Sequence, residues 1–103
     1  MKTPVIIRRF KVGCELIALF PTLPGTCDPS TCLSYMRLGQ HGSASVGLVS
    51  DTVGVKPYEI EGSTAVKSLL AELAVAGYDL QLVTRFTCKH SRTRIDALKG
   101  VSA

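Results

Sequence analysis

One short segment of this chain is apolar at every position: Leu16-Ile17-Ala18-Leu19-Phe20, closed by Pro21. A strand with one face in water alternates apolar and polar side chains, whereas a strand covered on both faces does not. The segment therefore predicts a central strand, and the fold must cover both sides of a sheet. Residues 5 to 11 are also strand-like, and Val12 to Glu15 separate the two runs, so together they predict a β-hairpin with Gly13 in its turn.

Turn-forming residues follow this hairpin. Prolines, a glycine and an aspartate predict a loop over residues 21 to 31, because proline fixes φ and removes a ladder donor. Residues 32 to 38 then predict a third strand. Its alternation gives two faces, of which the predicted core face carries Cys32, Ser34, Met36 and Leu38 and the other carries Leu33, Tyr35 and Arg37.

The middle of the chain has no clear period. Gly39 and Gly42 flank Gln40-His41, and this segment predicts a break in regular structure. Residues 46 to 50 are compatible with a short fourth strand. The run from Gly47 to Val55 is compatible with either one bent edge strand or a packed loop, and pattern alone does not choose between them.

A helix is predicted from about Thr64 to Ala76. Ser63 suits the N-cap, Gly77 suits the left-handed position after the last turn, and apolar residues recur at i, i+3, i+4 and i+7. Residues 79 to 86 alternate as a strand would, and residues 88 to 99 have only a weak helical tendency, which predicts at most a short terminal helix.

This order of elements predicts an α+β fold in one domain, residues 1–103. An antiparallel sheet of three to five strands begins with a hairpin, and one main helix packs on a face. Hydrophobic residues make up 46% and charged residues 19% of the chain, which excludes an intrinsically disordered protein.

The sequence also bears on where the protein is located. No apolar run approaches the roughly 20 residues that span a bilayer, and arginines interrupt the apolar start of the chain, so we expect a cytoplasmic protein without a membrane partner. In a reducing compartment the four cysteines are expected to be thiols, so their even number does not indicate disulfides.

Cysteine and histidine side chains are the residues of this chain that suit metal or thiol chemistry. The candidate zinc ligands are Cys27, Cys32, His41, Cys88 and His90. Their spacing fits a structural zinc site poorly, so no metal ligand and no cofactor is predicted. No residue set completes a catalytic motif, although a metal-dependent or thiol enzyme centred on Cys32 and His41 stays open as the alternative.

Basic residues are spread unevenly along the chain. The net charge is +4 with a pI near 9.0, and five cations against one acid lie in the last twenty residues. If the first and last strands are neighbours, basic residues from both ends form one face able to contact phosphates. The predicted nucleic-acid-binding residues are Arg9, Lys11, Arg85, Lys89, Arg92 and Arg94.

A second candidate surface lies in the middle of the chain. Two polar residues, Gln40 and His41, follow Tyr35 and Arg37 closely in sequence, and we predict that these four form a small-ligand or peptide contact.

Several segments carry a resemblance: Ile7-Arg8-Arg9-Phe10-Lys11, Ile17-Ala18-Leu19-Phe20-Pro21, Thr31-Cys32-Leu33-Ser34-Tyr35-Met36 and Gly39-Gln40-His41-Gly42. Together they resemble a family of short, uncharacterised bacterial proteins, many encoded on mobile or accessory DNA. The similarity extends over most of the chain, including Gly77-Tyr78 and Arg85-Phe86. The family has no established activity, so the resemblance implies no functional residues.

These observations favour a small non-catalytic binding or adaptor protein. Its expected partner is nucleic acid or another protein. Self-association is predicted as well, because a high apolar content and an exposed strand edge both promote it.

Overall fold

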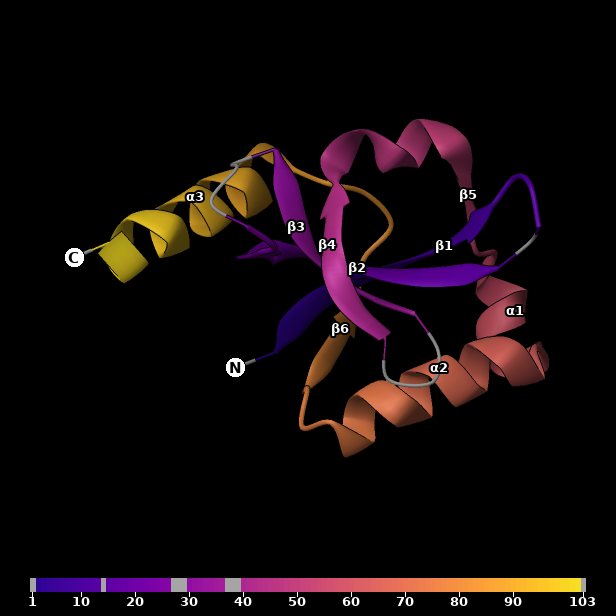
Figure 1. Ribbon diagram of the computed structural model, residues 1–103. Coiled ribbons are helices and arrows are strands. Elements are labelled where there is room, and N and C mark those ends of the chain that lie inside the picture. Colours follow the sequence, from indigo (N-terminus) through magenta and orange to yellow (C-terminus); the bar gives the residue numbers. More distant parts are fainter. Residues whose placement is uncertain (1, 14, 27–29, 37–39, 103) are drawn as a thin grey trace.

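A computed structural model describes residues 2–13, 15–26, 30–36 and 40–102. In these ranges, five strands form an antiparallel ladder in the order β4-β3-β2-β1-β5, and β6 pairs with β1 (Figure 1). The strands are β1 (Thr3–Phe10), β2 (Leu16–Pro24), β3 (Thr31–Met36), β4 (Gln40–Ser45), β5 (Thr52–Gly54) and β6 (Leu80–Leu82). The helices are the 3₁₀ helix η1 (Val46–Asp51) and the α-helices α1 (Pro57–Gly62), α2 (Thr64–Val75) and α3 (Cys88–Ser102).

The predicted α+β class and the opening hairpin are confirmed. β1 and β2 are antiparallel, with Ile6 opposite Leu19, and Gly13 lies in the turn with a φ of 86°. This left-handed conformation costs glycine little because it has no Cβ atom.

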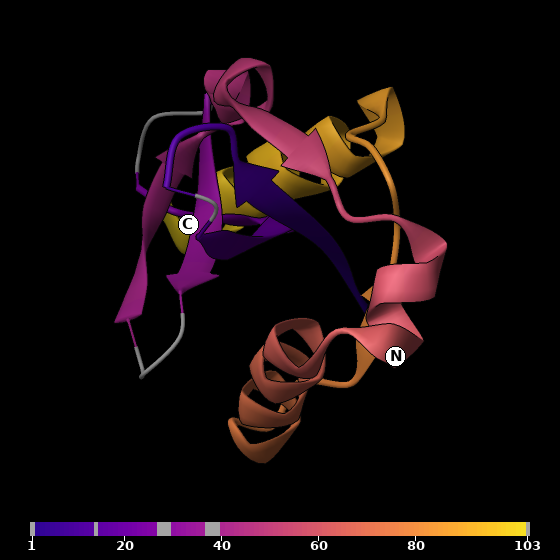
Figure 2. The ribbon, with the colours of Figure 1, turned by 90° about the vertical axis from the view of Figure 1, so that its right-hand side faces the viewer.

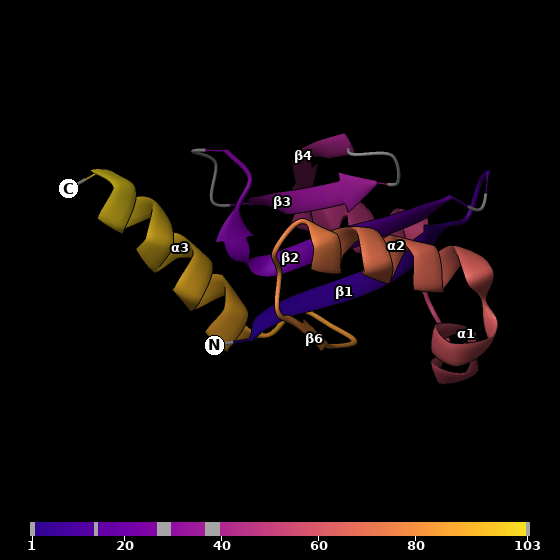
Figure 3. The same ribbon diagram turned by 90° about the horizontal axis from the view of Figure 1, so that it is seen from below.

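β2 is covered on both faces, as its apolar run predicts. Each residue from Leu16 to Phe20 is at most 7% exposed. On one face, Ala18 and Phe20 pack with Leu69 of α2. Figure 3 shows α2 crossing the strands on this side.

The opposite face of the sheet has a separate apolar cluster. Ile17 and Leu19 lie there with Cys32, and Leu48 of η1 and Phe86 cover them. The connection from β6 to α3 runs past β5 and α1 (Figure 2). Full burial of one such side chain stabilises a fold by about 1.5–3 kcal/mol, so these two clusters account for much of the stability.

The boundaries of α2 are also confirmed. The Ser63 hydroxyl accepts a hydrogen bond from the Val66 N–H at 3.4 Å, as expected of an N-cap. Gly77 follows the helix with a φ of 102°.

The prediction for the middle of the chain is wrong at Gln40-His41. These residues do not break regular structure but begin β4, which pairs with β3 from Met36↔Gln40 to Thr31↔Ser45. Backbone pairing with a formed β3 outweighs the low strand propensity of this glycine- and serine-containing segment. Residues 46 to 50 form η1 and not a fourth strand. Within the run from Gly47 to Val55, Thr52–Gly54 form β5, which is an edge strand at one end of the strand order.

The last third also differs from its prediction. The strand expected over residues 79 to 86 is limited to β6, which is parallel to β1, with Val5 opposite Leu82. The expected C-terminal helix is confirmed as α3, which continues beyond residue 99 to Ser102, whereas α1 has no counterpart among the elements expected from the sequence. Among the described residues, no helix has the length and apolar character needed to cross a membrane.

Candidate functional site

Tyr35, the first residue of the predicted ligand surface, lies in the core. It is 4% exposed, and its hydroxyl donates a 2.7 Å hydrogen bond to Glu72 Oε1 of α2. Cys32 and Ser34, on the predicted core face of β3, are buried as expected. Tyr35 on the opposite face is buried as well, so both faces of β3 contribute to the core. Tyr35 links β3 to α2 and is not presented to solvent.

The other three predicted ligand-binding residues are described in part or not at all. Arg37 lies outside the described residues, as do the side chains of Gln40 and His41. The register places His41 opposite Tyr35 and Gln40 opposite Met36, which brings the backbones of three of the four residues together. Whether their side chains meet in one site stays a prediction.

Cys32 lies in surroundings that oppose thiol chemistry. It is 0% exposed, and burial raises the pKa of its thiol above the ordinary value, although nearby Arg94 acts in the other direction. A thiol with a raised pKa stays protonated, and the protonated form is a poor nucleophile and metal ligand. Cys32 is opposite Ala44, three residues from His41, so about 10 Å of strand separates the two backbone positions.

Within the described ranges, no three His, Cys, Asp or Glu side chains are grouped as metal ligands would be. Cys27 of the candidate ligand set lies outside those ranges.

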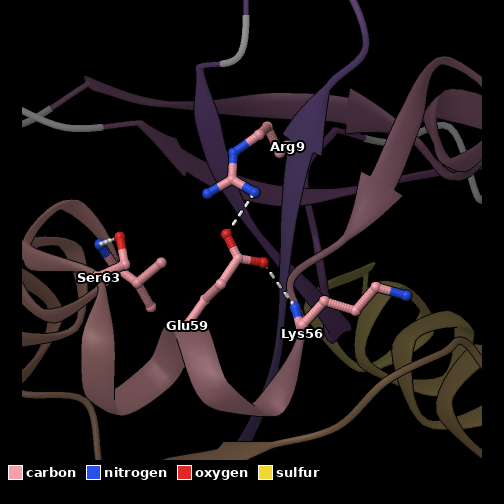
Figure 4. Close-up of polar contacts among 5 residues, drawn as sticks. Arg9, Lys56, Glu59 and Ser63 are labelled. Carbon is pink, nitrogen blue, oxygen red and sulfur yellow. Dashed lines mark hydrogen bonds and ion pairs between the residues drawn. The ribbon is translucent and has the colours of Figure 1, made fainter.

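Arg9 is neutralised by a carboxylate of α1 (Figure 4). Its Nη1 lies 2.6 Å from Glu59 Oε1, and Glu59 Oε2 accepts a 2.9 Å hydrogen bond from the Lys56 N–H. The Lys56 N–H and then the Arg9 guanidinium lower the pKa of Glu59 below its ordinary value. Glu59 therefore closes the start of α1 and fixes α1 to β1, and Arg9 has a structural partner.

Two further residues of the predicted nucleic-acid-binding set, Lys11 and Arg94, form hydrogen bonds within the fold. The Lys11 ammonium donates to the Ser50 carbonyl at 2.9 Å, which joins the hairpin to η1. Arg94 is 2% exposed, and its Nη1 donates to the Pro21 carbonyl at 2.7 Å. Because this guanidinium is buried, Arg94 holds α3 against β2 and does not lie on the same surface as its basic neighbours.

The remaining predicted nucleic-acid-binding residues, Arg85, Lys89 and Arg92, lie on and just before α3. We call Arg85, Lys89, Arg92 and Lys99 the α3 basic surface, and all four are exposed. Across the part of the chain that is described, no side-chain hydrogen bond or ion pair engages them. Successive residues of an α-helix are rotated by about 100° around its axis, so Lys89, Arg92 and Lys99 lie within an arc of about 80° around α3. The same arc contains one acid, Asp96.

The start of α3 is fixed by a reciprocal cap. The Thr87 hydroxyl accepts from the His90 N–H at 3.1 Å, and His90 Nδ1 accepts from the Thr87 N–H at 3.3 Å. This is the capping-box arrangement with histidine in the usual place of glutamate or glutamine. It positions Lys89 and Arg92 on the first turns of a defined helix.

Two residues of this part of α3, Asp96 and Lys99, are not among the nucleic-acid-binding residues predicted from the sequence. The spacing 89, 92, 96 and 99 follows i, i+3, i+7 and i+10, which would have placed both on one helical face with Lys89. That signal was present in the sequence, but it has meaning only once a full-length helix is expected there.

An open groove of about 540 Å³ lies along this side of α3. Its apolar part comes from Phe86 and Ile95, and charged side chains of Arg92, Asp96 and Lys99 also line it. The groove therefore shares Arg92 and Lys99 with the α3 basic surface, and the two together are the candidate site.

Comparison with known proteins gave no match to this chain, whether to a protein-family model, a curated protein or a solved structure.

Proposed function

We propose that this is a small non-catalytic binding protein that holds nucleic acid through the α3 basic surface. The observation that carries the proposal is the division among the basic residues. The side chains of Arg9, Lys11 and Arg94 form hydrogen bonds or an ion pair within the fold, whereas the four exposed cations of the α3 basic surface form neither with the described residues.

The spacing of these cations suits a phosphate backbone. Lys89 and Lys99 are ten residues apart, which corresponds to about 15 Å along a helix. Successive phosphates of one strand rise by about 3.4 Å along a duplex, so several phosphates fall within reach of the surface. Lysine and arginine bind phosphates in a sequence-independent way, as expected of a general contact.

The surface is also held in place before a partner binds. The Thr87–His90 cap fixes the first turn, and Arg94 ties the middle of α3 to β2. A surface that is already ordered loses less conformational entropy on binding than a flexible basic tail.

The alternative, a metal-dependent or thiol enzyme centred on Cys32 and His41, has less support. It needs a thiolate that a base or metal can reach, whereas Cys32 is buried and its thiol pKa is raised.

A second copy of this chain is also a partner compatible with this proposal. β4 is at one end of the strand order, and its sequence, Gln40 to Ser45, contains no Lys, Arg, Asp, Glu or Pro. Edge strands without such residues are open to pairing with another strand. We therefore include self-association through β4, which would place the α3 basic surfaces of two copies on one particle.

The test is a mobility-shift titration of single-stranded and double-stranded oligonucleotides at about 50 mM and about 200 mM salt. The wild type is expected to bind at low salt and to weaken at high salt. The double variant Lys89→Glu, Arg92→Glu is expected to lose affinity by about tenfold or more, because two attractive contacts become repulsive.

Lys67→Glu is the matched control, since Lys67 is an exposed cation of α2, remote in sequence from α3. It is expected to bind as the wild type does. Absence of binding to both oligonucleotides at low salt, or equal losses in the double variant and the control, would overturn the proposal.

A further inference from the structure

Asp96 is an unexpected residue on a phosphate-binding surface. It lies on the same arc of α3 as Lys89, Arg92 and Lys99, and it is exposed. Asp96 is four residues after Arg92 and three before Lys99, a spacing at which helical ion pairs form. Yet, of the residues that the structure describes, none forms an ion pair with Asp96. A carboxylate here repels phosphates, so a surface for phosphates alone gains nothing from it.

The Asp96 carboxylate belongs to the lining of the groove beside α3. Asp96 lines it together with Phe86, Ile95 and Ser91, so the lining combines aromatic and aliphatic side chains with a carboxylate and a hydroxyl. Arg92 and Lys99 also line it and carry positive charge. Apolar walls with a few polar groups are typical of small-molecule sites, and aromatic side chains are the usual partners of unstacked bases. The groove of about 540 Å³ is largely open to solvent, so a base from a flexible strand can reach its lining.

We propose that the groove receives one base of a single-stranded nucleic acid and that Asp96 reads its Watson–Crick edge, with guanine preferred. This inference rests on the proposed function, because Arg92 and Lys99 would hold the flanking phosphates. In a duplex that edge is already paired, so the site selects unpaired bases.

The choice of guanine follows from the donors that each base offers. An ionised carboxylate only accepts hydrogen bonds and has two oxygens to do so. Guanine presents two adjacent donors, N1–H and the N2 amino group. Adenine and cytosine each place a ring acceptor beside their single amino group, and thymine places its N3–H between two carbonyl oxygens. Guanine alone satisfies both carboxylate oxygens without a repulsive neighbour.

Fluorescence anisotropy tests this with labelled single-stranded decamers at fixed low salt. One probe is all thymidine, and three others carry a single dG, dA or dC at the centre. The wild type is expected to bind the dG probe about tenfold more tightly than the all-thymidine probe, the discrimination typical of a bidentate base contact. A duplex containing the same dG is expected to bind more weakly than the single strand.

Asp96→Asn separates base reading from phosphate binding. It is expected to abolish the preference for dG, while affinity for the all-thymidine probe stays equal or rises because a negative charge is removed. The matched control is Glu61→Gln, an exposed carboxylate of α1, which is expected to retain the preference. Circular dichroism checks that both variants fold.

The outcomes distinguish the two proposals. Equal affinity of the wild type for all four decamers, or a dG preference that survives Asp96→Asn, overturns the base-reading role and leaves phosphate binding intact. Absence of binding to every probe overturns the proposed function and this inference together.

Discussion

Cys32 and Cys88 are both thiols, but their surroundings give them opposite reactivity. Cys32 is buried and its thiol pKa is raised, whereas Cys88 is exposed on the first turn of α3. Alkylation needs a thiolate that the reagent can reach. We predict that iodoacetamide labels Cys88 in the native protein and labels Cys32 only after unfolding.

Peptide mapping by mass spectrometry checks this site by site, with urea-unfolded protein as the reference for complete labelling. Rapid native labelling of Cys32 at neutral pH would contradict its burial and would revive the thiol-enzyme alternative.

Glu59 makes the stability of the α1 region dependent on pH. Its pKa is lowered in the folded protein by the Lys56 N–H and by Arg9. A carboxyl with a lowered folded-state pKa contributes stability that is fully present above its unfolded pKa of about 4.3 and is lost as the pH falls through the folded value. We predict that Glu59→Gln is less stable than the wild type at neutral pH. This difference in stability is expected to shrink as the pH falls from about 4.3 through the lower pKa of Glu59 in the folded protein.

Urea unfolding of the wild type and Glu59→Gln across this pH range measures the difference, and Glu61→Gln controls for loss of an exposed carboxylate. A difference between wild type and Glu59→Gln that stays constant with pH would show that the Arg9–Glu59 pair and the Lys56 bond do not stabilise the fold.

Helices and strands were predictable from the sequence where neighbouring residues carry strong signals for one type of structure. α2 was predicted with its caps because Ser63, an apolar stripe and Gly77 all agree. β4 was missed because its residues have low strand propensity and its existence depends on pairing with β3. α1 was missed because six residues carry too little periodicity, and because Glu59 has its partner in Arg9, fifty residues earlier.

α3 depends on its first turn more than its sequence suggests. Its polar residues give a weak apolar stripe, so the Thr87–His90 cap contributes much of what starts the helix. We predict that His90→Ala destabilises the protein by about 0.5–1 kcal/mol, because the Thr87 N–H loses its acceptor, whereas His90→Gln restores a standard capping box.

Urea unfolding gives the stability of both variants, and hydrogen exchange of the first α3 amides reports on the cap itself. The idea fails if His90→Gln is as destabilised as His90→Ala, or if exchange at the start of α3 is unchanged in both.

For the whole molecule, the two-sided covering of β2 was predictable from five apolar residues, since no other arrangement removes both faces from water. The candidate site was less predictable. The basic character of residues 85 to 99 is visible in the sequence, but the burial of Arg94 and the pairing of Arg9 depend on contacts with Pro21 and Glu59. Such contacts between distant parts of the chain are set by the tertiary fold and not by local pattern.

β4 is at one end of the strand order and leaves an edge of the sheet open. We predict that the protein self-associates as its concentration rises, and that Ser43→Lys on this edge shifts the equilibrium to monomer, because a charge at an edge opposes strand pairing. Sedimentation velocity from low to high micromolar concentration measures this. Monomer throughout for the wild type would argue against pairing through β4.

The central claim is that the α3 basic surface neutralises phosphates, and the salt dependence of binding to a single-stranded oligonucleotide tests it most directly. Four neutralised phosphates predict a slope of about −3 for log K against log salt, and Lys89→Ala or Arg92→Ala is expected to reduce its magnitude by about 0.7 each. Lys67→Ala is expected to leave the slope unchanged. A wild-type slope near zero, or an equal change in Lys67→Ala, would contradict the claim.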